Sequence, residues 1–184
     1  MAANKSAQRA FDAQTHDAFD TLAATHPAAL IDRLNAANVN PATYLATDYI
    51  NHFNQIAMLL QIVETMPEMA DDVAAWSEKT YRQHFLDSGF SETPLILWAY
   101  DHAPGPTRRA FDSETDSLTE EVQAAVSLVT AGSPAPQRAL IDGIHARIAT
   151  LYAIVNAPDG APQDLARNNG QGAIGQSDID SLFD

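Results

Sequence analysis

Large apolar residues return every three or four positions along most of this chain, and that spacing constrains the fold more than any other feature. A helix places such residues on one face, whereas a half-buried β-strand needs strict alternation of apolar and polar positions. No convincing run of alternating β-branched residues is present. We therefore predict an all-α protein built as a helical bundle.

The most apolar of the predicted helices is expected to lie at the centre of this bundle. Asn40-Pro41 has the form of a start signal, a capping asparagine followed by proline at the first helical position. The helix is predicted to run to about Met66 and to be the longest of the chain. Its main apolar face is spaced at three- and four-residue steps: Tyr49, Phe53, Ile56, Leu60 and Val63.

Proline and glycine divide the rest of the chain into further predicted helices. Boundaries are expected at these positions: His26-Pro27, Pro67, Thr80, Asp87-Ser88-Gly89, Pro94 and His102-Ala103-Pro104-Gly105-Pro106. A long helix is expected through Phe111 and Val129, and a last one from about Pro136 to Val155. Residues 1–156 are thus predicted to form one helical domain.

The composition changes after this domain. From Ala157 to Gly175 the only large apolar residues are Leu165 and Ile174, and four of the eight glycines of the chain lie there. Such a segment buries too little apolar surface to offset the entropy lost on ordering. We therefore predict a disordered, flexible linker over residues 157–173.

Apolar side chains return in the last segment, residues 174–184. Three of them share one stripe of a helix, at positions i, i+3 and i+4: Ile179, Leu182 and Phe183. Ser177 and Asp180 have the spacing of a capping box, and Asp178 adds negative charge near the positive end of the helix dipole. Because so short a helix is unstable alone in water, we expect it to fold in the groove of a partner.

This segment resembles the docking peptide of the FliM family of bacterial flagellar switch proteins, which binds the phosphorylated chemotaxis regulator CheY. The agreement covers about ten of the 184 residues, at Ile174, Gln176, Asp178, Ile179, Asp180, Leu182 and Phe183. Gly175 departs from the family, which usually has a capping serine there; Ser177 is expected to take over that role. The resemblance implies contact with a CheY-like response-regulator receiver, in two-component signalling for chemotaxis and flagellar motility.

The order of helical body, linker and terminal helix is also similar to the layout of the CheY phosphatase CheZ. A phosphatase of that kind needs an acidic side chain and an amide. The central helix offers such groups on one polar stripe: Asp48, Asn51, His52 and Gln55. This stripe can equally be the wetter side of a half-buried helix, so our main prediction is an adaptor and the phosphatase is the alternative.

Two further interpretations rest on single motifs. His52 is a candidate phosphoacceptor on a bundle helix, but the lysine and glycine that usually follow such a histidine are absent. Gln176 with Leu182 and Phe183 loosely resembles the peptides that bind the DNA sliding clamp, although the spacing is too long for them. Both interpretations are weaker than the receiver-docking prediction.

Charge and composition narrow the function classes. The formal net charge is −14, from 24 acidic and 10 basic residues, so neither nucleic acid nor an anionic membrane surface is expected as a partner.

The longest apolar clusters fall far short of the roughly 20 residues of a membrane span, and the N-terminus lacks the apolar stretch of a secretion signal. With no cysteine in the chain, we predict a cytoplasmic protein. The histidines show no metal-ligand spacing, and no metal or cofactor is expected.

Overall fold

The computed structural model describes residues 16–132 and 138–158. Regular structure in these two ranges is helical, apart from one isolated antiparallel bridge between Val39 and Ala46. The prediction of an all-α bundle is therefore confirmed. None of the helices in the described ranges has the length and apolar character needed to cross a membrane.

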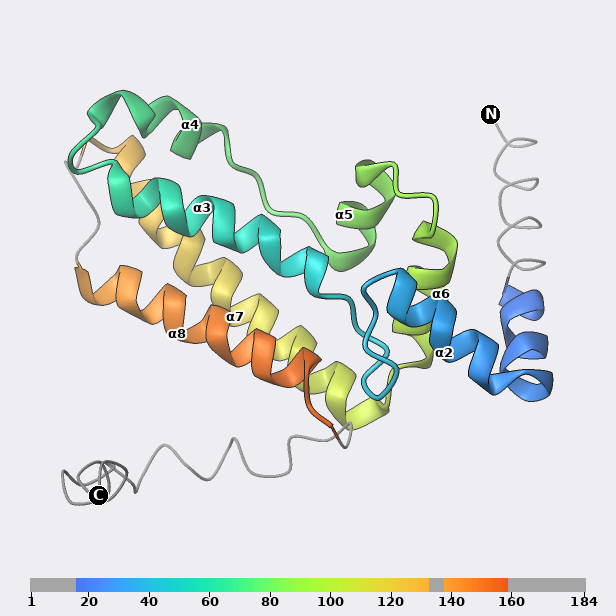
Figure 1. Cartoon of the computed structure of the whole chain (residues 1–184). Coiled ribbons are helices and arrows are strands. Elements are labelled where there is room, and N and C mark those ends of the chain that lie inside the picture. The colour runs from blue at the N-terminus through green and yellow to red at the C-terminus, as the bar shows by residue number, and fades with distance from the viewer. Residues whose placement is uncertain (1–15, 133–137, 159–184) are drawn as a thin grey trace, which may run out of the picture.

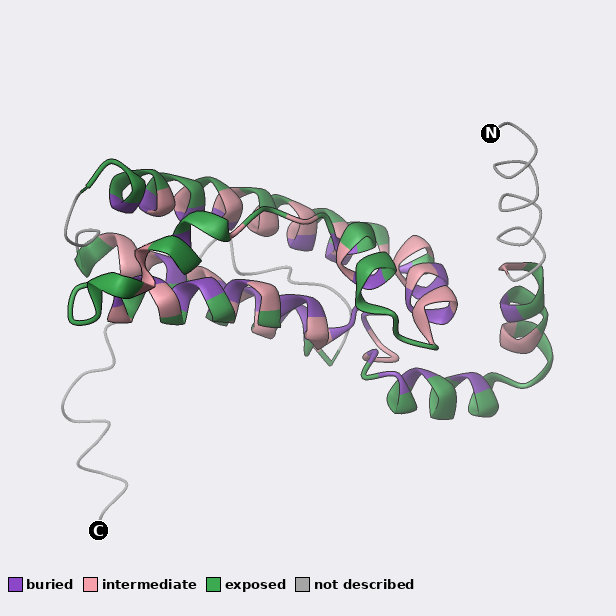
Figure 2. Cartoon of the chain, turned by 90° about the horizontal axis from the view of Figure 1, so that it is seen from above, coloured by how far each residue is buried: buried purple, intermediate pink, exposed green. Residues whose placement is uncertain are grey.

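Three long helices lie side by side: α3 (Ile50–Ile62), α7 (Gly105–Thr130) and α8 (Arg138–Val155) (Figure 1). Helix α8 runs antiparallel to α7, and α3 packs against both. Their facing sides bury aliphatic residues at helical spacing: Ile56, Leu60, Leu118, Val122, Ile144, Ile148 and Leu151. Figure 2 shows buried and exposed residues on opposite sides of the long helices that are visible from above. We call these three helices the long-helix bundle.

Shorter helices form the other end of the molecule. They are the helix at residues 16–25, α2 (Pro27–Ala36), α5 (Tyr81–Ser88) and α6 (Thr93–His102). We call them the short-helix end. Between α3 and α5, a 3-10 turn η2 (Pro67–Met69) leads into α4 (Ala70–Ala75), which packs against α7 and α3.

Several helix boundaries follow the local signals in the sequence. Proline stands in the first turn of α2, η2 and α6, as predicted. Helix α5 begins at a capping box, in which the Thr80 hydroxyl accepts from the backbone N–H of Gln83 and the Gln83 side chain accepts from the Thr80 N–H. It ends at Gly89, whose φ of 70° is a left-handed conformation that glycine adopts without steric cost.

The predicted start of the central helix at Asn40-Pro41 is wrong. Asn40 Oδ1 accepts a hydrogen bond from the backbone N–H of Ala42 at 2.8 Å, so the asparagine closes a tight turn instead of capping a helix. Tyr44 then takes a left-handed φ of 60°. The chain therefore turns back on itself at this point.

The central helix is also shorter than predicted. It starts after the turn, as the 3-10 segment η1 (Thr47–Tyr49), continues as α3 and ends at Ile62 instead of Met66. Its 13 residues compare with 26 in α7. Helix α3 thus lies within the bundle, but α7 is the longer helix.

The loop before α3 also holds the end of α8. The Thr43 hydroxyl, which is fully buried, donates a hydrogen bond of 2.7 Å to the carbonyl oxygen of Val155. Ile154 and Val155 are themselves buried against the core. The last turn of α8 is therefore tied to a loop more than a hundred residues away in sequence.

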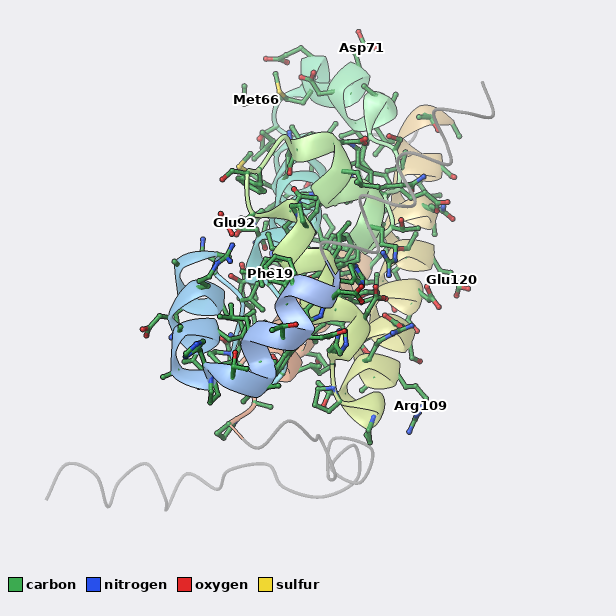
Figure 3. The ribbon with its side chains drawn as sticks, turned by 90° about the vertical axis from the view of Figure 1, so that its right-hand side faces the viewer. Phe19, Met66, Asp71, Glu92, Arg109 and Glu120 are labelled. Atoms are coloured by element: carbon green, nitrogen blue, oxygen red, sulfur yellow. The ribbon has the colours of Figure 1, made fainter. Side chains whose placement is uncertain are left out.

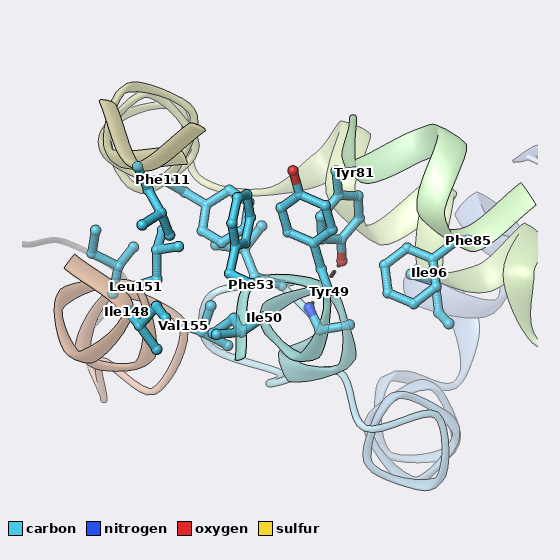
Figure 4. Packing of buried hydrophobic residues seen from close by; sticks show 14 of the residues in the cluster. Tyr49, Ile50, Phe53, Tyr81, Phe85, Ile96, Phe111, Ile148, Leu151 and Val155 are labelled. Carbon is cyan, nitrogen blue, oxygen red and sulfur yellow. Dashed lines mark hydrogen bonds between the residues drawn. The ribbon is translucent and has the colours of Figure 1, made fainter. Parts of the chain in front are cut away.

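Aromatic rings fill the junction between the long-helix bundle and the short-helix end (Figure 4). Tyr49 packs edge-on against both Phe53 and Tyr81, at ring-centre distances of 5.5 and 5.3 Å. Tyr81 also stacks on Tyr100 at 4.4 Å. Its hydroxyl oxygen accepts a buried hydrogen bond of 2.9 Å from the backbone N–H of Ala46.

The helix at residues 16–25 is held at the short-helix end by one ring and one carboxylate. Phe19, labelled in Figure 3, is buried 5.7 Å from the ring of Trp98. Asp20 accepts a hydrogen bond of 2.8 Å from Trp98 Nε1, and the same oxygen lies 3.2 Å from Nε2 of His102.

The predicted linker 157–173, beyond Pro158, and the predicted docking segment 174–184 lie outside the described residues.

Candidate functional site on helix α3

The polar stripe predicted on the central helix is divided in the structure. Asn51 and Gln55 are exposed one turn apart on the outer side of α3. Asp48 lies in η1, before the α-helix begins, and its Oδ2 accepts a hydrogen bond of 3.2 Å from the Asn38 side chain. His52 is half-buried and faces aromatic neighbours. The four residues are close in sequence but do not converge on one point.

His52 is enclosed by rings from three parts of the chain. Its imidazole stacks on Trp76 with 5.2 Å between ring centres and 22° between planes. Phe53 lies edge-on at 5.4 Å, and the ring of His84, from α5, is 6.1 Å away. No sequence motif predicts that Trp76 and His84 approach His52, because their positions depend on the path of the chain through α4.

This environment lowers the pKa of both histidines. Burial lowers the pKa of His52 to about 4, with further contributions from the nearby His84 and the Lys79 ammonium. Burial and Lys79 also lower the pKa of His84. Burial disfavours the imidazolium form, so His52 is neutral near pH 7.

Two polar atoms in this ring cluster are hidden from solvent. Within the described ranges, neither His52 Nε2 nor Trp76 Nε1 has a hydrogen-bond partner. A phosphoryl donor cannot reach Nε2 in this conformation, because the atom is covered. The structure therefore gives no support to His52 as a phosphoacceptor.

Hydrogen bonds hold residues 76–80 in place over this ring cluster. The Tyr49 hydroxyl donates to the backbone oxygen of Lys79 at 2.8 Å, and Lys79 Nζ pairs with Asp87 at 2.9 Å. Burial is also the main cause that raises the pKa of Tyr49, so this phenol stays protonated as a donor. The segment 76–80 is thus attached to both η1 and α5.

The outer side of α3 offers amides. Asn51 Oδ1 is 3.5 Å from the Asn54 side-chain nitrogen, and that nitrogen also donates to the Tyr152 hydroxyl at 2.9 Å. Gln55 is exposed, and beyond it Met58 has 55% of its surface exposed. An exposed amide can orient a water molecule, but the nearest predicted acid, Asp48, is bonded to Asn38 instead.

Metal chemistry has no obvious centre on this part of the chain. Within residues 16–132 and 138–158, no group of three or more histidine, cysteine, aspartate or glutamate residues is arranged to hold a metal ion.

Seven predicted partner-binding residues lie outside the described ranges: Ile174, Gln176, Asp178, Ile179, Asp180, Leu182 and Phe183.

Comparisons of the chain with models of protein families, with curated proteins and with solved structures found no match.

Proposed function

We propose that this chain is a cytoplasmic adaptor of bacterial chemotaxis and motility signalling that docks a CheY-like receiver domain through residues 174–183. One observation carries the proposal: an apolar stripe flanked by acids, at the end of a glycine-rich segment. The stripe consists of Ile179, Leu182 and Phe183, and the acids are Asp178 and Asp180. An amphipathic helix of this kind binds by laying its apolar side in a groove.

The free energies expected for docking of this segment favour weak, reversible binding. Each of the three large side chains gains about 1.5–3 kcal/mol on burial. Ordering about ten residues and losing translational freedom oppose that gain. The expected dissociation constant is micromolar to millimolar, which suits a signalling contact that must form and release quickly.

The body supports the adaptor over an enzyme through the arrangement of its polar groups. Asp48, the acid predicted for catalysis, is bonded to Asn38, and His52 is covered by Trp76. The role assigned to the body is to carry the docking segment from the end of α8.

Calorimetry against a receiver activated by a phosphate analogue tests this proposal. The full chain and a peptide of residues 172–184 should bind with similar affinity, and a chain truncated after Gly172 should not bind. Ile179→Ala and Phe183→Ala should each weaken binding by about 1–3 kcal/mol, roughly tenfold or more. Ser181→Ala is the matched control, because Ser181 lies off the stripe. Intact binding by the truncated chain would refute the docking assignment.

A CheZ-like phosphatase is the second candidate, favoured by the exposure of Asn51 and Gln55 one turn apart. If it is correct, the full chain accelerates loss of phosphate from a phosphorylated receiver, and Gln55→Ala abolishes that acceleration while the domain stays folded. An unchanged dephosphorylation rate with the wild-type chain removes this candidate. We expect the rate to be unchanged.

A further inference from the structure

A small groove lies where the end of α2 meets the turn between α5 and α6. Its volume is about 210 Å³, below the roughly 300–1,000 Å³ typical of sites for small-molecule ligands. The lining includes Ala36, Ala37, Asp48, Phe90, Glu92 and Ile96. A space of this size suits one side chain of a partner, not a cofactor.

The inner part of the groove is apolar and one wall is an exposed ring. Ile96 and Ala37, both buried in the core, are among the residues that line the groove. Phe90, which follows the left-handed Gly89, keeps 48% of its surface exposed. An aromatic ring left open beside a hollow is a surface on which a long side chain can pack.

The rim carries negative charge that the described residues do not neutralise. Glu92 pairs with Arg33 at 3.1 Å, so its charge is compensated (Figure 3 labels Glu92). Asp48 accepts a hydrogen bond from the neutral Asn38 amide, and no lysine, arginine or histidine of the described ranges forms an ion pair with it. Asn38 reaches Asp48 from a left-handed backbone, with φ of 56°, which asparagine tolerates. A carboxylate that forms no ion pair, in a chain of net charge −14, favours a cationic occupant.

We propose that this groove binds an arginine side chain on an exposed segment of a partner protein. The methylene stem of arginine packs on Ile96 and the Phe90 ring, and the guanidinium donates to the Asp48 carboxylate. Arginine fits better than lysine, because its planar group stacks on an aromatic face while it donates two parallel hydrogen bonds.

A guanidinium of the chain itself already binds in this manner next to the groove. Arg33 donates to Glu92, and its guanidinium carbon lies 5.2 Å from the centre of the Phe19 ring. The combination of a carboxylate and a ring therefore holds arginine at this end of the molecule. In the groove, Asp48 and Phe90 offer the same combination without an occupant from the described residues.

The acidic C-terminal segment is a poorer occupant than arginine. Asp178 and Asp180 would approach the Asp48 carboxylate on the rim, and like charges repel. The proposal is independent of the receiver-docking function, because it concerns only residues of the helical body.

Nuclear magnetic resonance of the full-length chain tests the proposal with two capped tripeptides, Gly-Arg-Gly and Gly-citrulline-Gly. Citrulline has the shape of arginine but no charge. The arginine peptide should shift the backbone amides of residues 36–38 and 90–92 and bind at least about fivefold more tightly than the citrulline peptide, because charge-assisted hydrogen bonds are about twice as strong as neutral ones. Raising the salt concentration should reduce this preference.

Two variants and one control complete the test. Asp48→Asn should remove the preference for arginine, and Phe90→Ala should weaken binding of both peptides. Asp32→Asn, which removes an exposed carboxylate elsewhere on α2, should change neither. Equal binding of both peptides, shifts confined to other surfaces, or an equal effect of Asp32→Asn would each overturn the proposal. So would a wild-type dimer that dissociates on Phe90→Ala, since the occupant would then be a second copy of the chain.

Discussion

The long-helix bundle and the short-helix end are held together by different kinds of contact. In the bundle, aliphatic side chains such as Leu118 and Leu151 interdigitate along regular helical faces. At the short-helix end, rings and single hydrogen bonds join segments that have little regular spacing, as with Trp98 and Asp20. In the bundle, the stability lost on truncating a side chain should therefore grow with the volume removed. At the short-helix end, the stability lost should depend on which polar group is left without a hydrogen-bond partner.

The largest expected effect is a cavity in the bundle. Leu151 is fully buried, so Leu151→Ala should lower the free energy of unfolding by about 2–5 kcal/mol in urea denaturation. Leu86→Ala is the matched control, because Leu86 is 64% exposed, and it should change stability by no more than about 0.5 kcal/mol. Equal costs at the two leucines would contradict the packing described for the bundle.

A smaller loss is expected when one hydrogen-bond acceptor is removed at the junction. Tyr81→Phe leaves the buried N–H of Ala46 without its acceptor, which should cost about 1–3 kcal/mol. Tyr152→Phe is the comparison, because its partner is the half-buried Asn54 amide, which can turn to water. If Tyr152→Phe lowers the free energy of unfolding as much as Tyr81→Phe, the burial of the hydrogen-bond partner does not determine the loss. The contrast drawn between the two tyrosines would then be wrong.

Acid should weaken the junction through His52. Its pKa of about 4 in the folded protein is below the ordinary value of about 6.5, so the unfolded chain binds the extra proton between these values. The free energy of unfolding should therefore fall as the pH drops from about 6.5 to 4, by about 1–2 kcal/mol after allowance for solvent screening of a half-buried ring. His84, whose pKa is also lowered, contributes in the same direction.

The variant His52→Gln isolates this contribution. Denaturation curves at pH 7 and pH 4.5 should differ less for His52→Gln than for the wild-type protein. His145→Gln, on the exposed side of α8, controls for the loss of a titratable ring. A wild-type difference that survives in His52→Gln would mean that the acid sensitivity arises elsewhere.

The smallest expected effect concerns the cap of α5. Thr80→Ala removes the oxygen that accepts from the Gln83 N–H and should cost about 1 kcal/mol. Thr80→Ser keeps the hydroxyl and should retain most of the stability. A loss of similar size in both variants would show that the methyl group of Thr80, not the cap, matters.

Sequence signals predicted the fold where the deciding interactions are local. The start of α5 depends on Thr80 and Gln83, and its end on Gly89, all within one or two turns of the boundary. Prediction failed at Asn40-Pro41, because an asparagine side chain accepts from a backbone N–H two residues later in both a helix cap and a tight turn. The bridge between Val39 and Ala46 and the left-handed Tyr44 show that a turn forms here, and neither follows from the Asn40-Pro41 pair.

The candidate site was predicted less well than the fold. The expected stripe assumed one α-helix through residues 48–55, but Asp48 lies in a 3-10 turn, which rotates about 120° per residue instead of 100°. Asp48 accepts a hydrogen bond from Asn38, a residue outside the predicted stripe. The ring cluster around His52 was missed for a different reason: Trp76 and His84 reach it only through tertiary packing.

The hydrogen bond from Thr43 to the carbonyl of Val155 has a mechanical consequence. Any pull on the C-terminal segment first reaches the described domain at the last turn of α8, where this bond joins the turn to the loop before α3. Tension would therefore be shared between two segments distant in sequence, instead of unwinding α8 from its end. A partner bound beyond residue 158 would pull on the core through the buried Ile154 and Val155. The last turn of α8 should therefore resist fraying under force.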